Sequence, residues 1–185
     1  GIISETQGLS VKTQSLDKRY YKLLFSKINQ FLLAKIQYPK RERDFFLHLK
    51  KALDNTYLFK NVILTNVGKV DNPDLISEFC SFSLRYDKAT WALSFGEINN
   101  RLIFSIRTEN RRAHAGRIAQ KIVGSNGSGG GHEMSAGGWI GLTDKDRIDS
   151  VTQHLIKNFL LQVGHKEDIT LTPLITKDIG MLKNG

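Results

Sequence analysis

A run of glycines with a histidine at its end is the part of this sequence best suited to bind an anion. Its last three glycines, Gly129, Gly130 and Gly131, directly precede His132. Glycine has no Cβ atom and adopts positive φ readily, so successive backbone amides can point into one concavity that holds an anion. The imidazole of His132 adds a hydrogen-bond donor whose charge is tunable near neutral pH. The pattern predicts a phosphate-binding turn.

Other glycine-rich motifs fit this run less well. A Walker loop requires Lys and then Ser or Thr after its last glycine, whereas His132 and Glu133 occupy those positions. A dinucleotide-binding fingerprint that began at Gly127 would need its third glycine where His132 lies. A flexible Gly/Ser linker is an alternative on composition. It is disfavoured because residues 134–142 lead straight into an apolar segment, whereas linkers lead into polar boundaries.

Ser105 and Arg107 are the second candidate for contact with phosphate. They lie at the end of the apolar segment 102–106, which is typical of a strand. A guanidinium at this place could hold a phosphate through two parallel hydrogen bonds, and the Ser105 hydroxyl could donate another. The alternatives are a surface salt bridge from Arg107 to Glu109 or another carboxylate, and a Ser105 hydroxyl that satisfies the end of the strand.

The glycine-histidine run resembles the Gly-Gly-Gly-His signature of the DHH-associated domain, the C-terminal module of DHH-family phosphoesterases. The run is followed by Ser135-Ala136-Gly137-Gly138. Upstream, Ser105-Ile106-Arg107 after an apolar strand, and then a helix with Gly116, Ile118 and Ala119, match that module's usual order of parts. Segments 70–75 and 91–93 are similar to the less studied bacterial members, so the resemblance covers about residues 40 to 142.

The resemblance implies the substrate-binding module of a metal-dependent phosphodiesterase or phosphoesterase. Its substrates would be short oligonucleotides or nucleotide phosphates, held by Ser105, Arg107 and the segment from Gly129 to His132. The family's metal pair, usually manganese, lies on a preceding DHH catalytic domain, so none is expected on this chain and the chain alone is expected to be inactive. A stand-alone nucleic-acid-binding domain without hydrolysis is the alternative, although aromatic residues are only 9% of the chain and do not interleave with a basic stripe.

The start of the sequence resembles the last motif of the DHH catalytic domain, usually Gly-Ile-x-x-Asp-Thr. Residues 1–6 read Gly-Ile-Ile-Ser-Glu-Thr, so Glu5 occupies the position of a metal-binding Asp. Glu5 could bind a hard cation through oxygen, or it could be a solvated acidic residue near a chain end. The expectation is a fragment in which residues 1–38 are the tail of the catalytic domain with a linker helix, and residues 39–185 form the DHH-associated domain.

Composition and charge favour a soluble, cytoplasmic protein with an anionic partner. The 185 residues include 27 Lys and Arg against 18 Asp and Glu, a formal charge of +9 that attracts phosphates without specifying a site. The chain has neither an apolar run long enough to span a bilayer nor a signal peptide, so no membrane partner is expected. A homodimer is left open. The sole cysteine, Cys80, lies among apolar residues at helical spacing and is expected to be buried.

Hydrophobic periodicity predicts an α/β fold with a mixed central sheet flanked by helices, plus an N-terminal helical remnant. The expected helices cover residues 16–36, 41–56, 113–123, a segment capped by Asn72, and a last one that begins at Thr143 or Asp144. The expected strands cover residues 62–64, 91–95, 102–106 and 139–142, with the second and third joined as a hairpin.

Overall fold

The computed structural model describes residues 9, 13–143, 148–166 and 168–176 of the chain. The chain divides into two compact units, Gly1–Glu42 and Arg43–Gly185. The first unit contains helices α2 (Ser15–Phe25) and α3 (Gln30–Gln37), and neither helix buries a residue. The second unit contains the sheet and its covering helices. None of the helices that the structure describes has the length and apolar character needed to cross a lipid bilayer.

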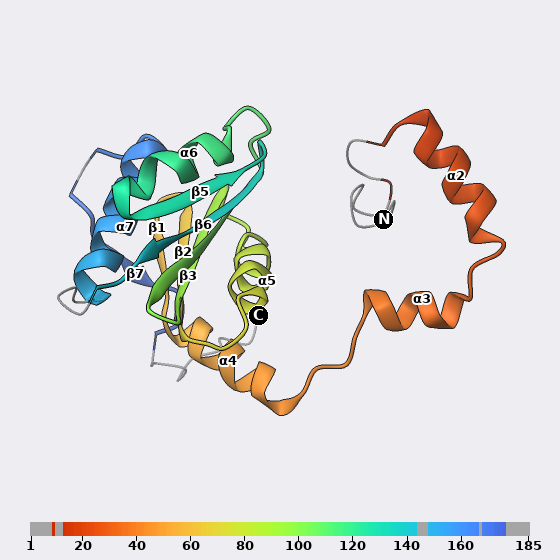
Figure 1. The fold of residues 1–185 in the computed structure, drawn as a ribbon, viewed down its shortest axis with the longest axis horizontal. Coiled ribbons are helices and arrows are strands. Elements are labelled where there is room, and N and C mark those ends of the chain that lie inside the picture. Colours follow the sequence, from red (N-terminus) through yellow and green to blue (C-terminus); the bar gives the residue numbers. More distant parts are fainter. Residues whose placement is uncertain (1–8, 10–12, 144–147, 167, 177–185) are drawn as a thin grey trace, which may run out of the picture. The chain divides into compact units, whose positions relative to one another are not determined.

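A seven-stranded sheet in the order β5-β6-β4-β3-β2-β1-β7 is the centre of the second unit (Figure 1). The strands are β1 (Thr56–Phe59), β2 (Val62–Lys69), β3 (Trp91–Ile98), β4 (Arg101–Thr108), β5 (Gly127–Gly131), β6 (Ser135–Gly141) and β7 (Thr172–Pro173). β2 and β3 pair in parallel, and the other neighbours pair antiparallel. The predicted mixed α/β sheet is confirmed.

Helices cover both faces of this sheet. α4 (Arg43–Asp54) and α5 (Asp74–Ser83) pack on one face, and α6 (Ala115–Ile122) and α7 (Ile148–Gln162) pack on the other (Figure 1). Successive side chains of β4 point to opposite faces of the sheet. Leu102, Phe104 and Ile106 join the core under α6 and α7, while Ile103 packs with α4 and α5. Residues 101, 105 and 107 therefore face the α5 side of the sheet, where the candidate site residues Ser105 and Arg107 are located.

The helix predicted over residues 16–36 is wrong as a single element, because α2 ends at Phe25 and α3 begins at Gln30. The Asn29 side chain accepts a hydrogen bond from the backbone amide of Leu32 at 3.1 Å. Asparagine at this position caps a new helix, so the local side-chain contact overrides a hydrophobic period that continues through the break.

The predicted hairpin is confirmed, although β3 extends three residues past the predicted segment 91–95 and β4 extends past 102–106 by one residue at its start and two at its end. β3 and β4 pair from Trp91–Thr108 to Ile98–Arg101, and the two linking residues, Asn99 and Asn100, both have positive φ (46° and 58°). Two consecutive positive φ values are typical of the turn that matches strand twist, and asparagine tolerates them. The hairpin fixes the register of Ser105 and Arg107 relative to β3.

The predicted start of the last helix falls at the edge of a segment outside the described residues. Thr143 is described and lies outside a helix, Asp144 lies outside the described residues, and α7 begins at Ile148. Leu155 and Phe159 of α7 are fully buried, whereas Ile148 at its start is exposed. Asn72 accepts a hydrogen bond from the Asp74 amide at 2.9 Å, as expected of a capping side chain, but the N-cap residue of α5 is Pro73, one position later than predicted.

Cys80 is fully buried on α5, as predicted. Its thiol donates to the carbonyl oxygens of Ser105 at 3.2 Å and Ala92 at 3.5 Å. Burial raises the pKa of the thiol above its ordinary value, and the nearby Arg107 guanidinium offsets this only in part. The group is a packed thiol that stays protonated near neutral pH.

We therefore expect native Cys80 to react with iodoacetamide at pH 8 at least about 100-fold more slowly than the urea-unfolded chain, because alkylation requires an accessible thiolate. Stability should also fall as the pH rises past the ordinary thiol pKa, since only the unfolded chain then gains free energy by ionising. Labelling followed by mass spectrometry tests the first point, and equal rates in the native and unfolded chain would show that the thiol is accessible.

Candidate functional site

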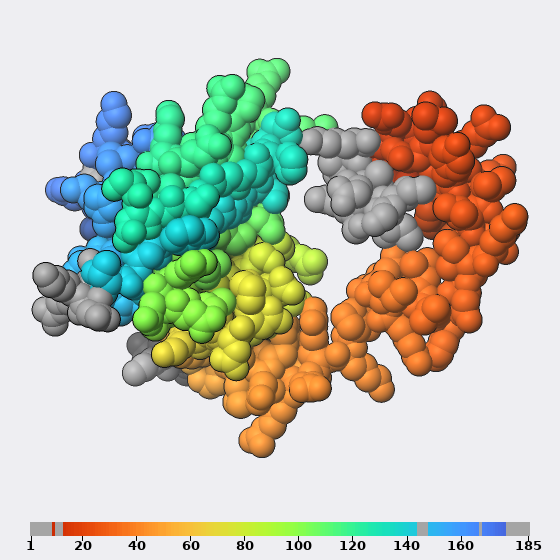
Figure 2. All heavy atoms as spheres, in the orientation of Figure 1, coloured from red at the N-terminus to blue at the C-terminus, as the bar shows by residue number. Residues whose placement is uncertain are grey.

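A groove of about 320 Å³ lies between α5 and the strands β4, β6 and β5. Five of the six predicted phosphate-binding residues line it, namely Ser105, Arg107, Gly130, Gly131 and His132. The opposite wall includes Ser77 of α5 and Pro73, which directly precedes that helix. In Figure 2, β5 and β6 are drawn in blue-green at the surface turned toward the viewer, with no helix in front of them.

The glycine run forms a strand, so the turn predicted from it is wrong. Gly127–Gly131 is β5, an edge strand that pairs with β6 from Gly127–Ile140 to Gly131–Ala136. Of its glycines only Gly131 has positive φ (150°), so no nest of left-handed residues forms. The actual turn is residues 132–134, where the His132 amide donates to the Ser135 carbonyl oxygen at 2.8 Å.

The glycines of β5 meet different surroundings on the two faces of the sheet. A Cβ atom on Gly129 would lie 2.5 Å from the carbonyl oxygen of Ala119, so α6 can approach β5 only where a side chain is missing. A Cβ atom on Gly130 would meet nothing within 4 Å, and Gly130 lines the groove. Because successive residues of a strand face opposite sides, Gly129 belongs to the packing under α6 and Gly130 to the groove. The structure thus separates Gly129 from the other five candidates.

Arg107 is half-buried and is held by neutral partners. Its Nη1 donates to Ser105 Oγ at 2.9 Å, to the carbonyl oxygen of Ile106 at 2.9 Å and to that of Ala136 at 3.4 Å. Its Nε donates to Ser81 Oγ at 3.2 Å. Within the described residues Arg107 forms neither a salt bridge to Glu109 nor an ion pair with another carboxylate. The guanidinium is therefore fixed in place with its positive charge not neutralised.

Ser105 orients Arg107. Its hydroxyl is buried, accepts the hydrogen bond from Arg107 Nη1, and lies 3.5 Å from the carbonyl oxygen of Ala136, to which it donates. With its proton directed at Ala136, the hydroxyl has little left to donate to a ligand. Its contribution to the groove is the position of the guanidinium.

His132 is exposed at one end of the groove, and its backbone is tied to α6. The carbonyl oxygen of His132 accepts from the Gly116 amide at 3.0 Å, and that of Glu133 accepts from the Ala115 amide at 2.9 Å. A Cβ on Gly116 would clash with the backbone of Gly131, so glycine is needed at this crossing. The start of α6 thus positions the histidine without engaging its imidazole.

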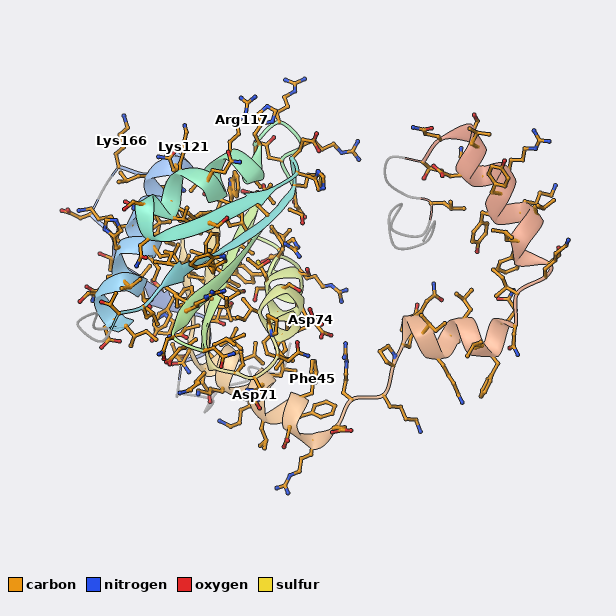
Figure 3. The ribbon with its side chains drawn as sticks, in the orientation of Figure 1. Phe45, Asp71, Asp74, Arg117, Lys121 and Lys166 are labelled. Carbon is orange, nitrogen blue, oxygen red and sulfur yellow. The ribbon has the colours of Figure 1, made fainter. Side chains whose placement is uncertain are left out.

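Two further charged regions lie outside the groove. Figure 3 shows Arg117 and Lys121 projecting from α6 away from the sheet, and Asp71 and Asp74 near the start of α5.

In the part of the chain that the structure describes, no three His, Cys, Asp or Glu side chains cluster in a way that could hold a metal ion. Glu5, the remnant metal position, lies outside the described residues.

Sequence reasoning missed a cation–aromatic pair beside the groove. The guanidinium carbon of Arg101 lies 4.4 Å from the centroid of the Trp139 ring. Ile103, which lines the groove, is the direct cross-strand partner of Trp139. Arg101 and Trp139 are 38 residues apart in sequence, so only the register of β4 on β6 brings them together.

Comparisons with known proteins agree with this picture of the fold. The family model described as "DHHA1 domain" matches residues 60–160. A protein of Methanocaldococcus jannaschii, described as "Uncharacterized protein MJ1633", is 29% identical over 176 residues, which is 91% of this chain and 36% of that protein. The crystal structure of an exopolyphosphatase-related protein from Bacteroides fragilis shares the fold, with a TM-score of 0.64 and 16% identity over 88% of this chain and 49% of that one. The chain thus spans about a third to a half of these two proteins.

Proposed function

Because this chain belongs to the DHHA1 family, the DHH-associated domains, we propose that its groove binds the phosphate of a short oligonucleotide or nucleotide substrate. In this proposal the domain holds the substrate for a metal-dependent phosphodiesterase or phosphoesterase whose reacting groups lie on a DHH domain. The observation that carries the proposal is that Arg107, Gly130, Gly131 and His132 line one groove although three different segments supply its walls.

The contacts of Arg107 support a role in binding. A charged group with no carboxylate partner among the described residues, fixed by hydrogen bonds to Ser81, Ser105 and backbone carbonyls, is ready for an anion at little cost in side-chain entropy. Gly130 leaves open the space into which an oxyanion can approach the strand, and the exposed imidazole of His132 adds a second donor at the end of the groove.

The described carboxylates, histidines and cysteine of this chain do not gather into a set of three that could hold a metal ion. The role of the chain's residues is to bind and orient the phosphate. Where the family's metals are present on the catalytic domain, they supply the activated water.

Titration of the 15N-labelled chain with pyrophosphate at low salt tests the site. We expect the largest amide shifts at residues 130–132 and 105–107, with smaller shifts around α7. Affinity should fall as salt is added, because the contacts are largely electrostatic. Shifts confined to other surfaces, with residues 130–132 unmoved, would show that the groove is not the phosphate site.

We also expect the purified 185-residue chain to show no manganese-dependent hydrolysis of a short oligonucleotide. The reason lies in the sequence, which lacks the Asp-His-His triplet and the Asp-rich motif through which the family binds its metal pair. Incubation with a labelled pentanucleotide and Mn²⁺, followed by gel analysis, measures this. Cleavage that persists through repeated purification, and that a metal chelator abolishes, would contradict the expectation.

A further inference from the structure

We propose that Arg101 and Trp139 form a stacking platform for a nucleobase, so that this groove prefers a phosphate ligand that carries bases over one that lacks them. The inference rests on the proposed phosphate site at Arg107 and adds a second contact at the other end of the same sheet face. The favoured substrates are then nucleotides or oligonucleotides, and inorganic phosphate chains are disfavoured.

The register of the strands places the pair on the groove side of the sheet. On β4, Arg101 is two residues from Ile103, which lines the groove, and side chains two apart share a face. On β6, the neighbour Gly138 points the other way, since a Cβ there would meet the ring of the core residue Phe104. Trp139 therefore lies on the same face as Gly137, Ser135 and the groove.

The surroundings of Trp139 differ from those of a core tryptophan. Trp91 is only 7% exposed and belongs to the core under α7. Its ring packs edge-on against the ring of Phe159, with the two ring centroids 5.9 Å apart. Trp139 is half-buried and belongs to none of the three core clusters of the described residues. A large aromatic ring next to the groove, with no core to fill, is available to a ligand.

Arg101 extends this surface and adds charge to it. Its guanidinium lies over the Trp139 ring, is exposed, and has no carboxylate partner within the described part of the chain. Nucleobases stack on aromatic rings and on the planes of arginine guanidinium groups. Each stacked base adds to the binding free energy whatever its identity. Arg101 can stack on the base or move aside and pair with a following phosphate.

Arg107 in the groove and the platform beside it are far enough apart to meet different parts of one ligand. Ser135 lies opposite Arg107 and Trp139 opposite Ile103, so the platform lies four positions along β6 from the residue opposite Arg107. At the usual rise of a strand this is about 13 Å. Gly137 and Gly130, which are paired across β5 and β6, line the floor between them without side chains.

The experiment compares two ligands on the 185-residue chain, the 5′-phosphorylated dinucleotide pApA and base-free tripolyphosphate. We expect Trp139→Leu to weaken pApA binding by about 5- to 150-fold, the range that the loss of one stacked base gives. Tripolyphosphate affinity should change less than about 2-fold, since surface changes away from a contact have small effects. Arg101→Gln should weaken pApA more than tripolyphosphate, and Arg117→Gln on the outer face of α6 serves as the matched control.

Tryptophan fluorescence provides a second readout. Trp91 and Trp139 are the only tryptophans, and the first is buried. Saturating pApA should quench the wild-type emission and leave that of Trp139→Leu unchanged, while tripolyphosphate quenches neither.

Three results would overturn the platform. If Trp139→Leu binds pApA as wild type does, while Arg107→Ala loses both ligands, the phosphate site stands and the stacking contact is wrong. If Trp139→Leu weakens both ligands equally, the residue acts through the fold. If the wild-type chain binds neither ligand, the proposed phosphate site and the platform both fail.

Discussion

Replacing Arg107 with alanine is expected to weaken the binding of pyrophosphate by about 10- to 150-fold, because a hydrogen bond to a charged group typically contributes about 1.5 to 3 kcal/mol. Arg107 is the half-buried cation of the groove, and its hydrogen bonds to neutral groups hold it in one orientation. The loss should appear at low salt in isothermal titration calorimetry.

The matched control is Arg117→Ala. Arg117 is exposed on α6, on the other face of the sheet, so it shares the long-range field of the net charge of +9 but none of the groove contacts. Its loss should change affinity less than about 2-fold at moderate salt, where exposed charges are screened. Equal losses in the two variants would mean that attraction by the overall charge, and no defined site, binds the anion. Unchanged affinity in Arg107→Ala would reject the guanidinium contact.

Removal of Arg107 is also expected to lower the stability of the fold, because its Nη1 donates hydrogen bonds to the carbonyl oxygen of Ala136 on β6 and to Ser105 Oγ on β4. Arg107→Lys separates the two effects. Lysine keeps the positive charge but cannot reproduce the fork of hydrogen bonds, so we expect intermediate affinity and a fold as stable as that of Arg107→Ala or more so. Thermal melts by circular dichroism check that each variant is folded before affinity is compared.

The parts of the fold that sequence patterns predicted are those whose faces are strongly buried. The helix α7, the hairpin of β3 and β4, and the hydrogen bond from the Asp74 amide to Asn72 ahead of α5 each follow from a local signal that tertiary packing reinforces. β1 and β7 were missed because they are short, and two to four residues carry too little periodicity to be recognised. No local sequence pattern predicts the order of the strands in the sheet, in which β6 lies between β4 and β5.

The residues of the candidate site could be predicted from the sequence, but the turn predicted for its glycine run is wrong. A run of glycines has low strand propensity and reads as a turn, yet pairing with β6 and contact with α6 hold Gly127–Gly131 extended. Conversely, Trp139 gave no sequence signal of function, since its relation to Arg101 depends on a register that no local pattern encodes.

Valine at two adjacent glycines of β5 is expected to have opposite effects. Gly129→Val should destabilise the fold by about 3 kcal/mol or more, at or beyond the upper end of what overpacking costs. The reason is that the new Cβ would lie 2.5 Å from the backbone oxygen and 2.8 Å from the backbone carbon of Ala119, and a helix backbone cannot yield as a flexible side chain can. Separation of α6 from β5 would remove Ala119 and Ile118 from the core that they share with α7.

Gly130→Val should leave stability within about 1 kcal/mol of wild type or raise it, because valine suits a strand and restricts the unfolded chain. Nothing in the described structure lies within 4 Å of the new Cβ, and Gly130 does not have positive φ. Its two methyl groups would instead stand in the groove and displace the phosphate, so pyrophosphate binding should fall at least about 10-fold, as for loss of a charged contact.

Urea unfolding followed by circular dichroism and calorimetric titration with pyrophosphate measure the two effects in the same samples. Gly129→Val is expected to show the lowered midpoint, and Gly130→Val the lost affinity with a normal midpoint. If Gly130→Val is as unstable as Gly129→Val, the space beside Gly130 is not open to solvent. If it is stable and binds pyrophosphate as wild type does, the anion does not approach β5 from the groove, because an isopropyl group and a phosphate cannot occupy the same volume.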